Sequence, residues 1–137
     1  MTEKFYLNKK NLPTIPVPHD CVIDEIKLKN DLLIFTFEQD ISYHDSIKYF
    51  KPDANSLVIK YHLVDNEFKV FEWQTLSEKG CFVCIDNNKL FAVTGHAKRT
   101  EYIGHFVAYN SMIIDLCAES SFRLEIETDY VEYEWEV

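Results

Sequence analysis

The strongest constraint on this chain is an alternation of apolar and polar side chains, which is clearest within residues 21–38. Leu33, Phe35 and Phe37 occupy every second position of the second half of this stretch. Successive side chains of a β-strand point to opposite faces, so this period predicts a strand with one apolar face. Asn30 and Asp31 lie between this run and the preceding one, and both residue types tolerate the positive φ of a two-residue turn. The stretch therefore predicts a β-hairpin.

The same alternation returns along the rest of the chain, with short polar breaks between the runs. The segments are 57–63, 68–73, 81–85, 90–94, 102–109, 112–116, 122–127 and 131–137. About eight to ten short strands without a long helical pattern are typical of an all-β antiparallel sandwich or flattened barrel. The alternative is an α+β fold with a helix within residues 43–50 or 72–79.

The length of 137 residues fits one domain with a sizeable core. Three prolines, at positions 13, 16 and 18, exclude a helix near the start and predict an extended arm over residues 1–20. Residues 21–137 are then one β-domain. Residues 40–54 lose the alternation and predict a long loop, with one helical turn near residues 45–50.

Three details of the strand pattern give sharper expectations. Asp65 and Asn66 predict a turn between two strands. The apolar parity changes within residues 68–73, which indicates a β-bulge or the end of a strand. Residues 81–85 and 90–94 predict a further hairpin, with its turn at positions 87 and 88.

The chain is acidic, with a formal net charge of -9 and a pI near 4.9. A field of this sign repels phosphate backbones, which argues against nucleic-acid binding and favours a basic protein as partner. No stretch approaches the roughly 20 apolar residues of a membrane span, and the start has no apolar signal-like run. We therefore expect a cytoplasmic protein with reduced thiols, the alternative being a signal removed before this start.

Cys81 and Cys84 form a Cys-x-x-Cys motif within an apolar run. On a strand, residues three apart face opposite sides of the sheet, whereas a zinc or redox pair needs a turn that brings both sulfurs together. We therefore expect buried structural thiols, and the sequence predicts neither a metal site nor a cofactor.

Histidine and aspartate stand side by side twice, at His19 with Asp20 and at His44 with Asp45. In space these pairs could meet in a pocket for a ligand or for acid-base chemistry. The locally basic loop 94–100 would add an anion site. The pocket residues of this alternative are His19, His44, Asp45, His96, Lys98 and Arg99. No nucleophile-elbow motif accompanies them, so no catalytic residue is assigned and surface or solubilising roles are favoured.

The last predicted strand carries a row of carboxylates at Glu132, Glu134 and Glu136. Strand periodicity places them on one face, where they repel each other unless a positive group compensates them. They form either a solvated face that prevents edge-to-edge aggregation or a docking surface for a basic protein. Asp45 and Asp53 of the 40–54 loop would extend that surface.

One pattern extends over much of the chain. It begins with His19-Asp20-Cys21, Ile23 and Ile26, continues after a polar turn with the alternating Leu33, Phe35 and Phe37, and ends with Tyr133-x-Trp135. This pattern resembles small acidic bacterial proteins of poorly characterised families, some of them grouped with immunity proteins that neutralise toxins. The resemblance implies a cytoplasmic binding protein without a cofactor. It transfers no functional residues.

These observations lead to one main hypothesis and two alternatives. The main hypothesis is a non-enzymatic β-sandwich that binds a basic protein, with toxin neutralisation as one form of that role, through acidic strand faces and the 40–54 loop. The first alternative is an enzyme or small-ligand binder that uses the histidine and aspartate pocket. The second is a homo-oligomer assembled through an open sheet edge. The sequence leaves partner identity, strand order and oligomeric state open.

Overall fold

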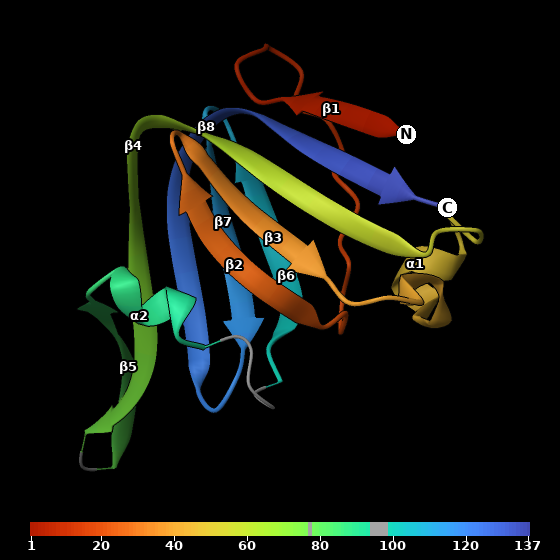
Figure 1. The fold of residues 1–137 in the computed structure, drawn as a ribbon. Coiled ribbons are helices and arrows are strands. Elements are labelled where there is room, and N and C mark those ends of the chain that lie inside the picture. Colours follow the sequence, from red (N-terminus) through yellow and green to blue (C-terminus); the bar gives the residue numbers. More distant parts are fainter. Residues whose placement is uncertain (77, 94–98) are drawn as a thin grey trace.

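Two long strands, β4 (Ser56–Leu76) and β8 (Ser121–Glu136), form the centre of the structure (Figure 1). They pair antiparallel along most of their length, from Ser56 opposite Glu136 to Glu72 opposite Phe122. All other strands attach to this pair directly or through a neighbour.

The computed structural model describes residues 1–76, 78–93 and 99–137. Within these residues, eight strands form one antiparallel sheet that does not close, in the order β2-β3-β4-β8-β7-β6, with β1 on β8 and β5 on β4. The remaining strands are β1 (Thr2–Tyr6), β2 (Ile23–Lys29), β3 (Leu32–Phe37), β5 (Lys79–Ile85), β6 (Glu101–Ala108) and β7 (Ser111–Cys117). The short helices are η1 (Ile41–Tyr43), α1 (Asp45–Lys48) and α2 (Asn88–Phe91). The all-β prediction is confirmed.

A bulge in the central pair bends the sheet. Leu63 lies opposite Thr128 and Phe68 lies opposite Ile126, so residues 64–67 of β4 face a single residue of β8. Asp65 and Asn66 adopt φ angles of 59° and 55° in this bulge. An unequal residue count in two paired strands kinks the strand and increases its twist. The bulge therefore turns the second half of β4 away from the first.

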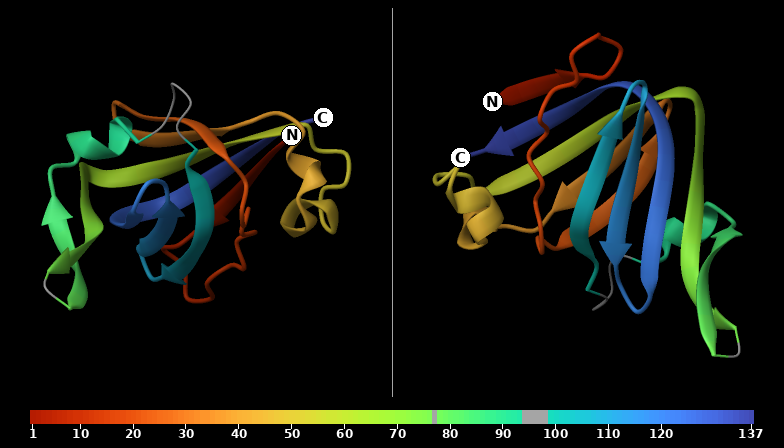
Figure 2. Two further views of the ribbon diagram at one scale, coloured as in Figure 1. Left: turned by 90° about the horizontal axis from the view of Figure 1, so that it is seen from below. Right: turned by 180° about the vertical axis from the view of Figure 1, so that it is seen from behind.

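The bend makes two layers out of one sheet. One layer holds β2, β3, the first half of β4, the second half of β8 and β1. The other holds β5, the second half of β4, the first half of β8, β7 and β6. Figure 2 shows the sheet folded over, with β6 and β7 opposite β2 and β3. The apolar faces of both layers meet in one core.

Three tyrosines are completely buried in this core: Tyr61, Tyr102 and Tyr133. The Tyr61 hydroxyl donates to the Tyr102 oxygen at 3.5 Å, and the Tyr133 hydroxyl donates to the carbonyl of Pro16 at 2.6 Å. Burial raises the pKa of all three phenols. Each hydroxyl is therefore a neutral group that links the sheet to its neighbours.

The outer edges of β2 and β6 meet at one corner, which we call the seam. Ile23 N donates to Thr100 O at 2.8 Å, and Tyr102 N donates to Cys21 O at 3.0 Å. An isolated bridge joins Val22 to Glu101. These few bonds bring the two edges together without a continuous ladder, so the sheet stays open.

The predicted N-terminal arm is extended and contributes its own strand. Residues 2–6 form β1 on the edge of β8, and Leu7 and Ile15 are buried in the core. The helical turn predicted in the 40–54 loop is present as α1, which buries Ile47. In the part of the chain that the structure describes, no helix has the length and apolar character needed to cross a membrane.

The structure corrects three details of the strand pattern. Asp65 and Asn66 do not separate two strands, because β4 continues past them along the same partner. No bulge or strand end falls within residues 68–73, since pairing there is regular, and the apolar Phe71 and Trp73 lie on the face opposite to the buried Phe68 and Val70. Residues 88–91 are a short helix that buries Leu90, where a returning strand was predicted.

The bend offers a test of its main side-chain hydrogen bond. Thr128 is buried and its hydroxyl lies 2.7 Å from His62 O and 2.9 Å from Tyr130 O. Thr128→Val should lower the free energy of unfolding by about 1 to 3 kcal/mol, because buried carbonyls lose their donor. The control Thr36→Val removes a hydroxyl of β3 for which the described structure gives no hydrogen bond. Urea unfolding monitored by tryptophan fluorescence measures both, and equal losses would contradict this role.

Candidate functional site

The predicted row of carboxylates on β8 is already compensated within the sheet. Lys60 Nζ of β4 lies 2.7 Å from Glu134 Oε1, and His62 is hydrogen-bonded to Glu132. Ser56 donates to Glu136 at 3.1 Å. The neighbouring strand β4 thus supplies partners for the whole row, and two of them are basic. Its use as a docking surface stays a prediction.

The 40–54 loop is a fixed support for exposed aromatic side chains. Ile41 and Ile47 anchor it in the core, while Tyr43 and Tyr49 are 87% and 86% exposed. Asp45 and Asp53, the two predicted contact residues of this loop, are also exposed. The loop therefore presents tyrosine and carboxylate groups from an ordered backbone.

The concave acidic surface of the molecule lies at the bend, in a depression of about 670 Å³. Residues from the β4 bulge, the start of β7 and the middle of β8 line it. Its ionisable residues are Asp65, Glu67, Lys69, Glu125 and Glu127. In contrast to Glu132 and Glu134, these carboxylates form no ion pair with any described basic residue. We call this surface the acidic depression.

The sequence pattern did not predict the acidic depression as a site. Glu125 and Glu127 belong to the predicted strand 122–127, whereas Asp65 was assigned to a turn far away in the chain and Glu67 to no element. The β4 bulge brings the two groups to one hollow. The available signal was a pair of turn-forming residues followed by a change of apolar parity.

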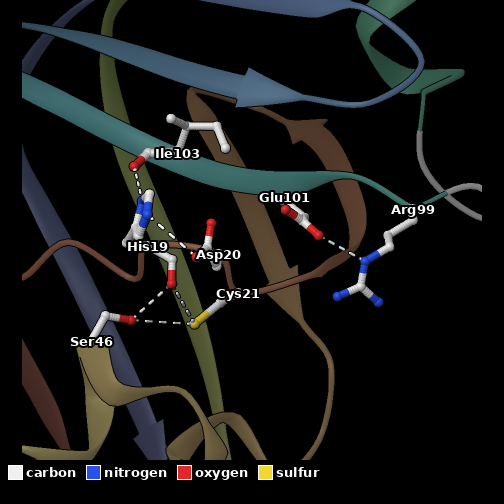
Figure 3. A network of polar contacts seen from close by, with 7 residues as sticks. All are labelled: His19, Asp20, Cys21, Ser46, Arg99, Glu101 and Ile103. Atoms are coloured by element: carbon white, nitrogen blue, oxygen red, sulfur yellow. Dashed lines mark hydrogen bonds and ion pairs between the residues drawn. The ribbon is translucent and has the colours of Figure 1, made fainter.

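Two of the predicted pocket residues, His19 and Arg99, lie at the seam (Figure 3). His19 Nδ1 lies 2.6 Å from the carbonyl of Ile103, and His19 Nε2 lies 3.3 Å from Asp20 Oδ2. A carbonyl can only accept, so Nδ1 carries the proton. The Nδ1 proton of His19 is therefore used by the chain itself, and the ring is held beside Asp20.

The structure brings only some of the other pocket residues near His19. Ser46 Oγ donates to His19 O at 2.9 Å, which places the start of α1, with His44 and Asp45, beside the arm. Arg99 Nε is paired with Glu101 at 2.8 Å on the other side of Cys21 (Figure 3). The predicted residues His96 and Lys98 lie outside the described part of the chain.

Among the described residues, the seam shows no pairing of a nucleophile with a side-chain base. Burial raises the pKa of the Cys21 thiol to about 12, so it is protonated at neutral pH. Its sulfur and the Ser46 hydroxyl both contact the backbone carbonyl of His19 instead of the imidazole. Nucleophilic catalysis needs a side-chain base within hydrogen-bond reach of the nucleophile. The described contacts therefore fit a structural junction.

The prediction of buried thiols at Cys81 and Cys84 is wrong, since both side chains are exposed on β5. The strand carries them on opposite faces, as expected for residues three apart, but β5 lies at an edge, where Ile85 packs against the core and the two cysteines do not. Among the described residues, no group of three or more His, Cys, Asp or Glu side chains is arranged to hold a metal ion.

No protein-family model, curated protein or solved structure matches this chain. The functional interpretation therefore depends on the residues and their geometry. The acidic depression and the exposed tyrosines of the 40–54 loop are two candidate surfaces for a partner among the described residues.

The thiols provide a direct check of the seam. In a Cys81→Ser/Cys84→Ser background, the exposed Cys117 should react rapidly with Ellman's reagent, whereas Cys21 should react only after unfolding. The reason is that the thiolate is the reactive form and burial suppresses it at Cys21. The absorbance released from the reagent at neutral pH, with and without urea, gives the number of exposed and of buried thiols. Rapid reaction of Cys21 in the folded protein would refute the buried junction.

His105 offers a second check, on the core side of β6. Its Nδ1 accepts from the Tyr102 hydroxyl at 2.5 Å and its Nε2 donates to Ile15 O at 3.1 Å, the arrangement of a neutral imidazole. Burial lowers its pKa below the usual 6.5. The unfolded chain therefore takes up the proton first, and stability should fall as the pH drops below about 6.5.

Denaturant unfolding between pH 7.5 and 5.5 measures this dependence. His105→Gln should flatten the dependence, because the protonatable ring is gone. The matched variant His44→Gln changes a histidine outside the core and should keep the wild-type slope. If both variants retain that slope, the role assigned to His105 is wrong.

Proposed function

We propose that this protein is a non-enzymatic binding domain for a basic protein, and that the acidic depression receives lysine or arginine side chains of that partner. The observation that carries the proposal is a contrast in charge compensation. The carboxylates of the β8 row have Lys60 and His62 beside them, while those of the depression have no ion-pair partner among the described residues.

Electrostatics favours a cationic occupant in this place. Asp65, Glu67, Glu125 and Glu127 share one hollow with a single cation, Lys69. Like charges held close together repel, so an incoming cation relieves a cost that the free protein carries. The net charge of -9 adds a long-range field that speeds the encounter with a basic partner.

The 40–54 loop supplies a second contact of different chemistry. The side chains of Tyr43 and Tyr49 are almost fully exposed to solvent. Tyrosine is enriched among the interface residues that contribute most to binding free energy. The buried Ile41 and Ile47 hold the loop in place, so the loop loses little conformational entropy on binding. Asp45 and Asp53 add charge at its rim.

Toxin neutralisation in the cytoplasm is the biological form of this function that we favour. A small acidic binding protein suits the role because it can cover a basic toxin without any chemistry of its own. The resemblance to immunity-type proteins points the same way. The histidine and aspartate pocket is the weaker alternative, because Nδ1 of His19 is already hydrogen-bonded to the carbonyl of Ile103.

Charge-neutral variants test the acidic depression. Glu125→Gln/Glu127→Gln should weaken capture of a basic partner from cells that make this protein, measured by quantitative mass spectrometry at 50 and 500 mM salt. Glu132→Gln/Glu134→Gln removes the same charge from the compensated row and is the matched control. We expect roughly a tenfold loss for the first pair at low salt, because each unscreened ion pair of this kind contributes about 1 kcal/mol.

Two results would contradict the proposal. One is the recovery of no basic protein at either salt concentration. The other is an equal loss of binding in both double variants, which would mean that overall charge and not the acidic depression determines capture.

A further inference from the structure

The strand β5 has one edge without a partner. It pairs with β4 from Val70 opposite Ile85 to Leu76 opposite Lys79, and no other described strand lies on its far side. The pairing of β4 with β8 ends at Glu72, so the end of the β4–β5 hairpin extends beyond the rest of the sheet, as Figures 1 and 2 show. Its outward backbone N–H and C=O groups are open to another strand.

This edge lacks the charges that normally protect an edge strand. Residues 80–85 contain no charged side chain, although the protein is strongly acidic. By contrast, the edge strand β2 carries Glu25, Lys27 and Lys29. Exposed apolar groups add to the effect, since Trp73 of β4 is 45% exposed and packs edge-on against Phe82 at 5.2 Å between ring centroids.

The charged residues at the two ends of the uncharged stretch have opposite signs, so they can pair with the same residues of a second copy. Lys79 stands at the start of the uncharged stretch and Asp86 stands directly after it. In an antiparallel pair of identical strands, the start of one strand meets the end of the other. Each Lys79 then approaches the Asp86 of the other copy.

We propose that β5 pairs antiparallel with β5 of a second copy of this chain, with Val83 on the twofold axis. Phe82 then faces Cys84 of the other copy, Cys81 faces its Ile85, and Gly80 faces its Asp86 beside Lys79. The two nearest alternative registers are less favourable: the one centred on Phe82 sets Glu78 opposite Asp86, and the one centred on Cys84 sets Asp86 opposite Phe82 and away from Lys79. Charge complementarity therefore selects the register centred on Val83.

The first experiment is sedimentation velocity of the full chain at 5 to 100 μM. The wild type should sediment as a dimer at the upper end, and Val83→Lys should sediment as a monomer, because two lysines would meet on the axis. Within one chain Val83 lies opposite Glu72, so a lysine at this position has a counter-ion and the fold should survive. Phe106→Lys places the same charge on the exposed face of β6, another edge strand, and should remain dimeric.

The second experiment does not depend on the stability of Val83→Lys. Directly opposed residues of antiparallel strands have Cα atoms about 4.5 to 5.5 Å apart, within the range that a disulfide spans. In a Cys81→Ser/Cys84→Ser/Cys117→Ser background, Val83→Cys should give a covalent dimer with copper phenanthroline as oxidant. Phe106→Cys in the same background should give none.

A monomeric wild type at 100 μM would overturn the proposal, as would equal cross-linking of Val83→Cys and Phe106→Cys. Pairing of the β5 strands is independent of the proposed basic partner. Glu125→Gln/Glu127→Gln should therefore still form the dimer, so the two proposals fail separately.

Discussion

The pairing of β4 with β8 is the interaction on which the rest of the structure depends. These strands carry β3 and β5 on one side and β7 and β1 on the other, and their shared bend turns one sheet into two layers. The bend follows from the bulge at Asp65 and Asn66. There, positive φ angles fold extra residues of β4 into a short stretch of the strand, which kinks it. Without that bulge, the apolar faces of the two halves would point to solvent on a single flat ribbon.

The bend also divides the acidic residues of this chain into two groups. In the regular part of the pair, Lys60 of β4 forms an ion pair with Glu134 of β8 and His62 is hydrogen-bonded to Glu132, so these carboxylates have partners within the sheet. Where the strands bulge, pairing is interrupted and Asp65 and Glu67 lie exposed beside carboxylates of β8. A single backbone irregularity thus creates both the shape and the uncompensated charge of the candidate binding site. The formal charge of the chain alone does not distinguish these two groups.

The sequence predicted what depends on local alternation and missed what depends on distant pairing. The 21–38 hairpin and the apolar side of Tyr133 and Trp135 follow from side-chain period two, and both are present. The bulge was interpreted as a turn because Asp and Asn favour the same dihedral angles in either setting. The thiols of β5 were predicted to be buried because periodicity does not reveal whether a strand lies at the centre or the edge of a sheet. The acidic depression follows from the first of these points, because the bulge brings Asp65 and Glu67 beside Glu125 and Glu127.

The position of β8 has a consequence for biosynthesis. It follows every other described strand in the sequence, yet it lies between β4 and β7 and also carries β1. On the ribosome, β4 must therefore wait for its long partner with Leu57, Ile59 and Tyr61 exposed, because hairpins such as β2–β3 can form early but cannot cover them. Nascent chains of this protein should accordingly depend on chaperones until the final strand emerges, and truncation before residue 121 should yield an aggregating product with no defined smaller fold.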